Sequence, residues 1–187
     1  MKEGNRDIHT DLVEQSIQGD RDARFQLYHL YSKAMYNICI RMVQNSEDAE
    51  DILQESFVAA FENLKSFRGN ASFGAWLKKI VINRCLNFLK KKRIQTEMLE
   101  EERQIPEDSE ETEVFASAGL IHRMIKELPD GARIVLNLHL LENYKHKEIA
   151  RMLDISESTS KSQYRRAISL LRKKLLQNED QETGRSY

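Results

Sequence analysis

The chain has 187 residues, enough for one large domain or two small ones. Seven glycines and two prolines, against 32% charged residues, favour helices over strands and turns. No stretch approaches the ~20 consecutive apolar residues that a membrane span needs. The first residues also lack the apolar run of a signal peptide. We therefore expect a cytoplasmic protein with no membrane insertion.

The cysteines and histidines form no catalytic or metal-binding pattern. Cys39 and Cys85 are far apart, in helical apolar segments without a Cys-x-x-Cys motif, so we expect buried core residues and no zinc site. His139 and His146 are expected to be solvated or locally bonded. No nucleophile–base pair or glycine-rich phosphate loop is present. The sequence thus predicts no catalytic residue, no metal and no cofactor, and the protein is not expected to be an enzyme.

Charge is segregated along the chain, although the net charge is only −1. Residues 46–64 carry six acids and no base, and residues 65–93 carry nine bases and no acid. Residues 94–113 carry nine acids and one base. Such asymmetry indicates two partners of opposite charge. We expect the acidic segment to meet a basic protein and the basic segment to meet DNA.

The first residues predict two core-facing helices. Residues 11–18 read as a short helix with Asp11 as a plausible N-cap. A longer helix starts at Asp20 or Asp22 and runs to about Val43, with apolar side chains at helical spacing.

A third helix starts at Ser46, a good N-cap residue, and is acidic in its first turn, which suits the positive end of a helix. Asp48, Asp51 and Glu55 are spaced i, i+3 and i+7, so they share one exposed face. By itself such a face fits either a solvated surface or a docking site for a basic partner. Its apolar stripe consists of Ala49, Ile52, Leu53, Ser56, Phe57, Ala60, Phe61 and Leu64.

A loop that contains a glycine leads into a basic helix, which Ser72 can cap. Asn83 and Asn87 are one turn apart and point the same way. Lysines on this helix can neutralise phosphates, and asparagine can hydrogen-bond a base edge. Phe73 and Trp76 fit ordinary core positions. Phe67 fits either the core or a platform for an unstacked base.

Residues 94–113 are too acidic to fold alone and are interpreted as a flexible linker. The fold class expected is therefore all-α, with two small helical domains, 11–93 and 114–177. In the second domain, one helix contains Ile121, Met124, Ile125 and Leu128 and stops before Pro129. The next runs from Gly131 to Leu141, with Ile134, Val135, Leu138 and Leu141 facing inward.

Residues 144–167 read as helix, short turn, helix. Ala150 is small where the two helices would cross, Ile155 plugs the turn, and Ser156 caps the second helix. This is the layout of a helix-turn-helix, whose second helix enters the major groove of DNA, although the turn lacks a glycine. The residues expected to face DNA are Lys161, Ser162, Arg165 and Arg166.

Taken together, the chain from about Asp11 to Leu176 resembles a bacterial RNA polymerase sigma factor of the small extracytoplasmic-function (ECF) type, in the sigma-70 family. The stretch Asp48-Ala49-Glu50-Asp51-Ile52-Leu53-Gln54-Glu55-Ser56-Phe57 is similar to the family's region 2.2. The stretch from Phe67 to Leu77, running on to Asn83-Arg84, resembles regions 2.3 and 2.4. Leu128-Pro129 with the helix-turn-helix resembles region 4.

The resemblance implies a factor that binds core RNA polymerase and directs promoter-specific transcription initiation. The implied partners are the clamp helices of the largest polymerase subunit, the flap of the second subunit, promoter DNA and an anti-sigma factor. The implied polymerase-binding residues are Asp48, Asp51, Glu55, Ile52 and Gln54. Those implied for the −10 element are Phe67, Arg68, Asn70, Ser72, Lys79, Asn83 and Asn87. The loop from Phe67 to Ser72 would hold an extruded base. Lys161, Ser162, Arg165 and Arg166 would read the −35 element.

This sequence departs from the family pattern around the recognition helix. Ser160 stands where valine is usual, and Gln163 where a base is common. Glu142-Asn143-Tyr144-Lys145 replaces the usual Gly-Leu-Ser-Tyr. These changes leave the expected fold intact and bear on the promoter sequence.

Two further hypotheses complete the sequence-based interpretation. A stand-alone helix-turn-helix regulator is the alternative function, but it gives the acidic helix 45–64 no use. The acidic linker, with Glu100, Glu101 and Glu102, is expected to fold back and screen the basic DNA-binding faces of the free protein.

Overall fold

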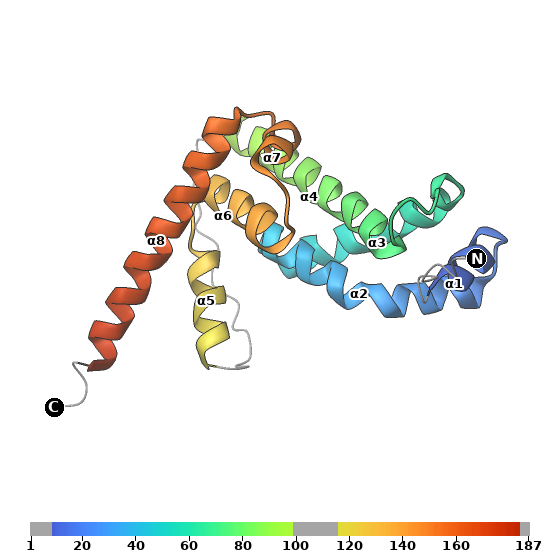
Figure 1. Cartoon of the computed structure of the whole chain (residues 1–187), viewed down its shortest axis with the longest axis horizontal. Coiled ribbons are helices and arrows are strands. Elements are labelled where there is room, and N and C mark those ends of the chain that lie inside the picture. The colour runs from blue at the N-terminus through green and yellow to red at the C-terminus, as the bar shows by residue number, and fades with distance from the viewer. Residues whose placement is uncertain (1–8, 99–115, 184–187) are drawn as a thin grey trace, which may run out of the picture. The chain divides into compact units, whose positions relative to one another are not determined.

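The computed structural model describes residues 9–98 and 116–183, and every regular element within these ranges is helical. The chain divides into unit 1, Met1–Met98, and unit 2, Leu99–Tyr187 (Figure 1). Unit 1 contains α1 (Thr10–Ile17), α2 (Arg21–Val43), α3 (Ser46–Glu62), a 3-10 turn η1 (Leu64–Ser66) and α4 (Phe73–Met98). Unit 2 contains α5 (Ala116–Lys126), α6 (Asp130–Leu136), a π-helical segment η2 (Asn137–Leu141), α7 (His146–Leu153) and α8 (Glu157–Thr183). The predicted all-α fold class is confirmed.

Short polar side chains start several of these helices. The Asp20 carboxylate accepts hydrogen bonds from the backbone N–H groups of Asp22 and Ala23, at 2.8 and 3.1 Å. Two predicted caps are wrong by one or two residues. Asn45, not Ser46, caps α3, because its side-chain oxygen accepts from the Asp48 N–H at 2.8 Å. At α1 the N-cap residue is His9, and Asp11 lies inside the first turn.

The core of unit 1 is formed by α2, α3 and α4, which all pack against one another, while α1 packs on α2 (Figure 1). Fully buried side chains from each of the three helices and from η1 fill it: Leu27, Met42, Ala49, Ala60, Leu64, Phe73, Leu77 and Ile82. Cys39 and Cys85 are buried free thiols, as expected. A hydrogen bond with Cys39, and then burial, raise the pKa of the Cys85 thiol well above its ordinary value.

The helix α4 is longer than the sequence predicts. Residues 94–98 continue it, so the helix extends into the segment interpreted as a linker. The rest of that segment, with Glu100, Glu101 and Glu102, lies outside the described residues. No helix within the described ranges is long and apolar enough to span a bilayer.

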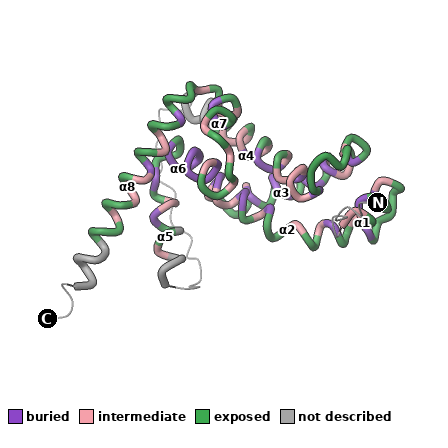
Figure 2. The backbone as a smooth tube through the Cα atoms, viewed as in Figure 1, coloured by how far each residue is buried: buried purple, intermediate pink, exposed green. Residues whose placement is uncertain are grey.

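The core of unit 2 lies where α6 packs on α8. Leu128, Ala132, Leu136 and Ala167 form a buried cluster there. Figure 2 shows α6 as a largely buried helix, and the run of buried residues extends from Ala132 into η2. Leu141 is 46% exposed, so its predicted inward position is wrong. The π-helical turn adds a residue, which shifts the following side chains around the helix axis.

The helix-turn-helix forms as predicted. The helix α7 ends at Leu153 and is followed by Asp154, whose φ of +54° is the left-handed conformation that glycine usually supplies. Asp154 therefore replaces the glycine that the turn lacks. The Ser156 hydroxyl oxygen caps α8 by accepting from the Thr159 N–H at 3.0 Å, as expected.

Candidate nucleic-acid and protein interfaces

The acidic face of α3 forms largely as predicted. Asp51, Gln54 and Glu55 are exposed, and Asp48 is half-buried. Ile52 is only 4% exposed, because it lies on the apolar stripe that packs into unit 1. Ile52, which we predicted to bind polymerase, is therefore a core residue beneath the acidic face and does not lie on its surface.

Two of these carboxylates already have partners on α4. A Glu55 carboxylate oxygen lies 2.7 Å from Arg84 Nη1, and an Asp48 carboxylate oxygen lies 3.1 Å from Lys92 Nζ. The side chains in both pairs remain partly or mostly exposed to solvent. The acidic face of α3 is therefore joined to the basic helix of the same unit by solvent-accessible ion pairs.

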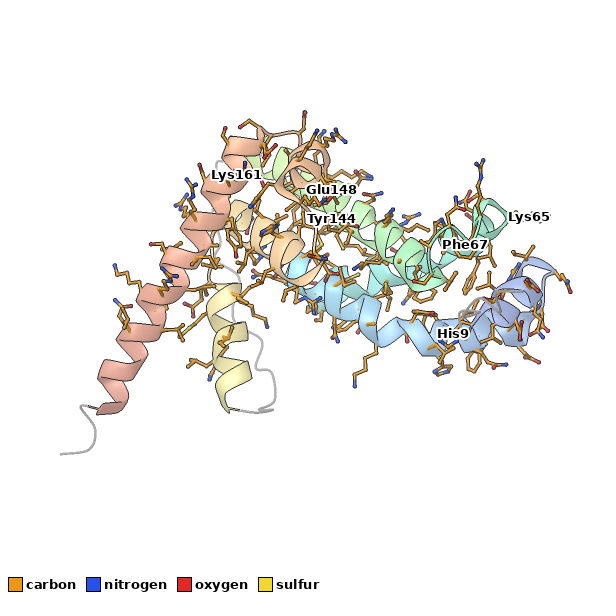
Figure 3. All side chains as sticks on the ribbon, in the orientation of Figure 1. His9, Lys65, Phe67, Tyr144, Glu148 and Lys161 are labelled. Atoms are coloured by element: carbon orange, nitrogen blue, oxygen red, sulfur yellow. The ribbon has the colours of Figure 1, made fainter. Side chains whose placement is uncertain are left out.

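An aromatic cluster lies where the loop between η1 and α4 meets the helices α4 and α2. The Phe67 ring lies 6.0 Å from the Phe73 ring and 5.4 Å from the Trp76 ring, measured between centroids. Phe67 and Trp76 are half-buried, whereas Phe73 is fully buried. Tyr31 of α2 completes the cluster, with its ring 5.3 Å from that of Phe73. Phe67, labelled in Figure 3 in the loop before α4, thus packs on the core and remains partly exposed.

The polar residues of this loop face solvent. Arg68, Asn70 and Ser72 are exposed, and Gly69 lies at a bend with a φ of +68°. The Ser72 hydroxyl oxygen accepts from the Ala75 N–H at 3.3 Å, so it caps α4 as predicted.

The α4 residues that we predict to contact the −10 element share one side of the helix. Lys79, Asn83 and Asn87 are all exposed, at positions i, i+4 and i+8 of one helix. Because such positions lie one above another, the three side chains form one polar row on α4.

The predicted reading face of α8 is also exposed. Lys161, Ser162, Arg165 and Arg166 all face solvent, while Ser160 and Ala167 are fully buried. Lys161, labelled near the start of α8 in Figure 3, pairs with Glu157 at 2.6 Å. Through this contact it holds the pKa of the Glu157 carboxyl below its ordinary value.

The sequence did not predict a cluster of side chains behind this face. His139 of η2, His146 of α7 and Tyr164 of α8 have their rings in mutual contact, and Ser160 bonds to His146. Both histidines are half-buried and locally bonded, which is one of the two expectations. A helical sequence pattern can indicate that each residue faces inward, but not that all four meet.

No group of three or more metal-ligating side chains occurs within the two described ranges. A pocket of about 410 Å³ opens between α1, α2 and the end of α3. Arg24 lines it and donates to the Ser16 carbonyl oxygen at 3.2–3.3 Å, which ties α1 to α2. None of the predicted site residues lines this pocket.

Comparison with known protein families gives two matches in the chain. Residues 27–94 match the model of sigma-70 region 2, and residues 118–171 match that of sigma-70 region 4. These ranges contain the α3 and α4 faces and the helix-turn-helix, respectively.

Individual relatives resemble this chain over most of their length. The ECF RNA polymerase sigma factor SigW of Bacillus subtilis is 32% identical, over 87% of this chain and 94% of the relative. The ECF RNA polymerase sigma-E factor of Salmonella typhimurium is 31% identical, over 83% and 88%. Among solved structures, the sigma factor RpoE of Bartonella quintana, in complex with the anti-sigma factor NepR, has a similar fold. Its TM-score is 0.59 and its identity 19%, over 80% of this chain and 94% of that one.

Proposed function

The chain belongs to the extracytoplasmic-function group of sigma-70 RNA polymerase factors, and we propose that unit 1 docks on core polymerase and reads the −10 element while unit 2 reads the −35 element. As a sigma factor, the protein directs transcription with RNA polymerase and is not an enzyme. The observation that carries the division of labour is the pairing, within unit 1, of an exposed acidic face on α3 with an exposed lysine–asparagine row on α4. A stand-alone DNA-binding regulator would have no use for the exposed acidic face of α3.

Docking on polymerase would use Asp48, Asp51, Gln54 and Glu55. Because Asp48 and Glu55 are paired with α4 in the free chain, docking would exchange these internal partners for basic side chains of the clamp helices. Exposed ion pairs contribute only about 0–1 kcal/mol, so the exchange costs little. The released Arg84 would then add positive charge beside the −10 reading row.

Reading of the −10 element would use the loop and α4 together. Extruding a base costs a few kcal/mol, which a stacking surface must return. The accessible part of Phe67, beside Trp76, is such a surface. Arg68, Asn70 and Ser72 would contact the extruded nucleotide, and Lys79, Asn83 and Asn87 the neighbouring backbone or base edges.

Reading of the −35 element would use the exposed side of α8. Lys161, Ser162, Arg165 and Arg166 lie near the start of this helix, the part that enters the major groove in a helix-turn-helix. Ser160 and Ala167 cannot read DNA from this position, because they are buried against the rest of unit 2.

The remaining partners follow from the same function. We infer that unit 2 contacts the flap of the second polymerase subunit, and that an anti-sigma factor holds the chain inactive. The latter is supported by the shared fold with RpoE, which was solved bound to such a factor. A promoter-binding factor of this kind acts in the cytoplasm.

The decisive experiment is co-migration with purified core RNA polymerase on gel filtration, comparing the wild type with Asp51→Lys. We expect wild-type binding and a loss of about tenfold or more in the variant, since like charges across an interface cost several kcal/mol. Glu50→Lys is the matched control, because it makes the same charge change on α3 outside the acidic row. If neither the wild type nor the variants bind core, while the protein alone shifts duplex DNA, the stand-alone regulator is the correct function.

A further inference from the structure

Four side chains from three elements meet behind the reading face of α8. The rings of His139 and His146 stack with centroids 4.2 Å apart and an angle of 24° between their planes. The ring of Tyr164 lies edge-on to both, at 4.8 and 5.6 Å. His146 Nδ1 lies 3.0 Å from the Ser160 hydroxyl oxygen. We call these four residues the histidine cluster.

The contacts of the histidine cluster join the elements that must keep a fixed geometry in a helix-turn-helix. His139 Nδ1 donates to the Tyr144 carbonyl oxygen at 2.8 Å, which fixes the connection between η2 and α7. His146 is the first residue of α7, and its bond to Ser160 reaches α8 across fourteen positions of sequence. The cluster therefore ties η2, α7 and α8 together at one point.

Ser160 is fully buried and directly precedes Lys161 and Ser162, which are exposed. Any rotation of α8 that turned Ser160 away from His146 would also redirect the reading residues one and two positions later. It would also leave a buried hydroxyl without its hydrogen-bond partner, which is unfavourable. The bond to His146 thus selects one rotation of the recognition helix.

We propose that His146 is a positioning residue for −35 recognition, fixing α8 through Ser160, and that the cluster does this only while the His146 ring is uncharged. This inference rests on the proposed function of unit 2. It adds a role for a residue that does not lie on the reading face, and it makes specific DNA binding depend on pH.

The charged groups around His146 favour its neutral form. His139 of η2 faces it, as do Lys161, Arg165 and Glu157 of α8, and the Tyr164 ring of α8 lies against it. Lys145 and Lys147 are its sequence neighbours. Burial first, then His139, Lys161 and Arg165, lower the pKa of His146 from its ordinary value of 6.5, against an opposing effect of Glu157. The unfolded chain therefore takes up this proton at higher pH than the folded one. Stability of the cluster falls as pH drops below 6.5, until the folded form is protonated too.

Acid has a second effect that must be separated from this one. Added positive charge strengthens binding to phosphates regardless of sequence. The quantity to measure is therefore the ratio of specific to non-specific affinity, which phosphate contacts alone change little. We predict that this ratio decreases as the pH is lowered, while the non-specific affinity stays constant or increases.

The test uses the full chain in holoenzyme and a duplex selected from a randomised pool at pH 7.5, with a shuffled duplex for comparison. Affinities are measured at pH 7.5 and 5.8 for the wild type, His146→Phe, Ser160→Ala and the double variant. At pH 7.5 each single change should lower the specificity ratio about fivefold, and the double change no further, because coupled residues are not additive. From pH 7.5 to 5.8 the wild-type ratio should fall about threefold, and that of His146→Phe should stay constant.

Two controls keep every outcome informative. His29→Gln changes an exposed histidine of α2 and should keep the wild-type pH profile. His146→Asn retains an amide near the position of Nδ1, so it should restore much of the pH 7.5 ratio without the pH dependence, even if His146→Phe does not fold. Additive losses in the single variants, or a pH profile that the His146 variants leave intact, would overturn the positioning role. Failure of the selection to enrich any duplex would instead count against the proposed function of unit 2.

Discussion

The two units hold their candidate reading helices in different ways. On the solvent side of unit 1, ion pairs join α4 to α3 through Glu55–Arg84 and Asp48–Lys92. In unit 2, the stacked rings and the Ser160 hydroxyl of the histidine cluster join α8 to α7 and η2. The first kind of contact is exposed and weakened by salt. The second is half-buried, and we expect its strength to depend on pH.

This difference matches what each helix is proposed to do. The contacts of α3 with α4 involve the same carboxylates that would bind polymerase, so they have to be exchangeable. The contacts behind α8 involve none of the residues that would read DNA, so they can stay in place during binding. A contact that a partner must replace is best made of exposed charges, and one that must persist is best made of packed groups.

The largest effect is expected when the buried packing of α4 is removed and its ion pairs are left in place. Phe73 is 1% exposed, at the start of α4, and contacts the rings of Tyr31, Phe67 and Trp76. We expect Phe73→Ala to lower the free energy of unfolding of unit 1 by about 3–5 kcal/mol. Urea titration followed by fluorescence of the single tryptophan, Trp76, measures it. Val58→Ala, at a 56% exposed position, is the control and should change stability by less than about 0.5 kcal/mol. Equal losses in the two variants would mean that packing does not hold α4.

A smaller effect is expected at the start of α8. Ser156→Ala removes the hydroxyl oxygen that accepts from the Thr159 N–H, and we expect it to destabilise the first turn by about 1 kcal/mol. Hydrogen exchange of the α8 amides, read by mass spectrometry, would show faster exchange in this turn. Ser162→Ala, on the exposed side of the same helix, should leave exchange unchanged. An unaltered rate in Ser156→Ala would show that the histidine cluster alone fixes this end of α8.

The smallest effect tests whether the ion pairs compete with polymerase. Arg84→Gln removes the internal partner of Glu55, so affinity for core polymerase without DNA should rise, by up to about fivefold at low salt. The gain should vanish near 1 M salt, where charge interactions are screened. Titration of labelled protein with core polymerase measures both. Lys90→Gln makes an equal charge change on the exposed side of α4 and should give no gain; if it gives the same gain, the effect is one of net charge.

Much of the fold could be predicted because it depends on local chemistry. The Asp20 and Ser72 caps, the α3 stripe and the helix-turn-helix follow from residue type and 3.6-residue spacing. The end of α4 could not, since no proline or glycine marks it. The predicted inward position of Leu141 was also wrong, because the spacing of apolar residues does not reveal a π-helical turn.

In the candidate interfaces, too, the features that depend on local sequence could be predicted, and those that depend on tertiary packing could not. The exposure of Lys79, Asn83, Asn87 and of the four α8 residues proposed to read DNA follows from their place opposite an apolar stripe. The partners of Glu55 and Asp48 are 29 and 44 residues away along the chain, so tertiary packing alone brings them together. The histidine cluster needs η2, α7 and α8 to be in place before its four residues meet. One sequence signal pointed toward it, namely Ser160 at a position where the family usually has valine.

The buried thiols of unit 1 determine how this protein can be labelled. Only the thiolate reacts readily with maleimides and oxidants, and both the high pKa and the burial of Cys85 keep its sulfur protonated and covered. Cys39 is fully buried in the same core. A single cysteine introduced on the surface of either unit can therefore carry a fluorophore without prior removal of the native pair. Distances between α4 and α8 could then be followed by energy transfer as the chain passes from free protein to holoenzyme to promoter complex.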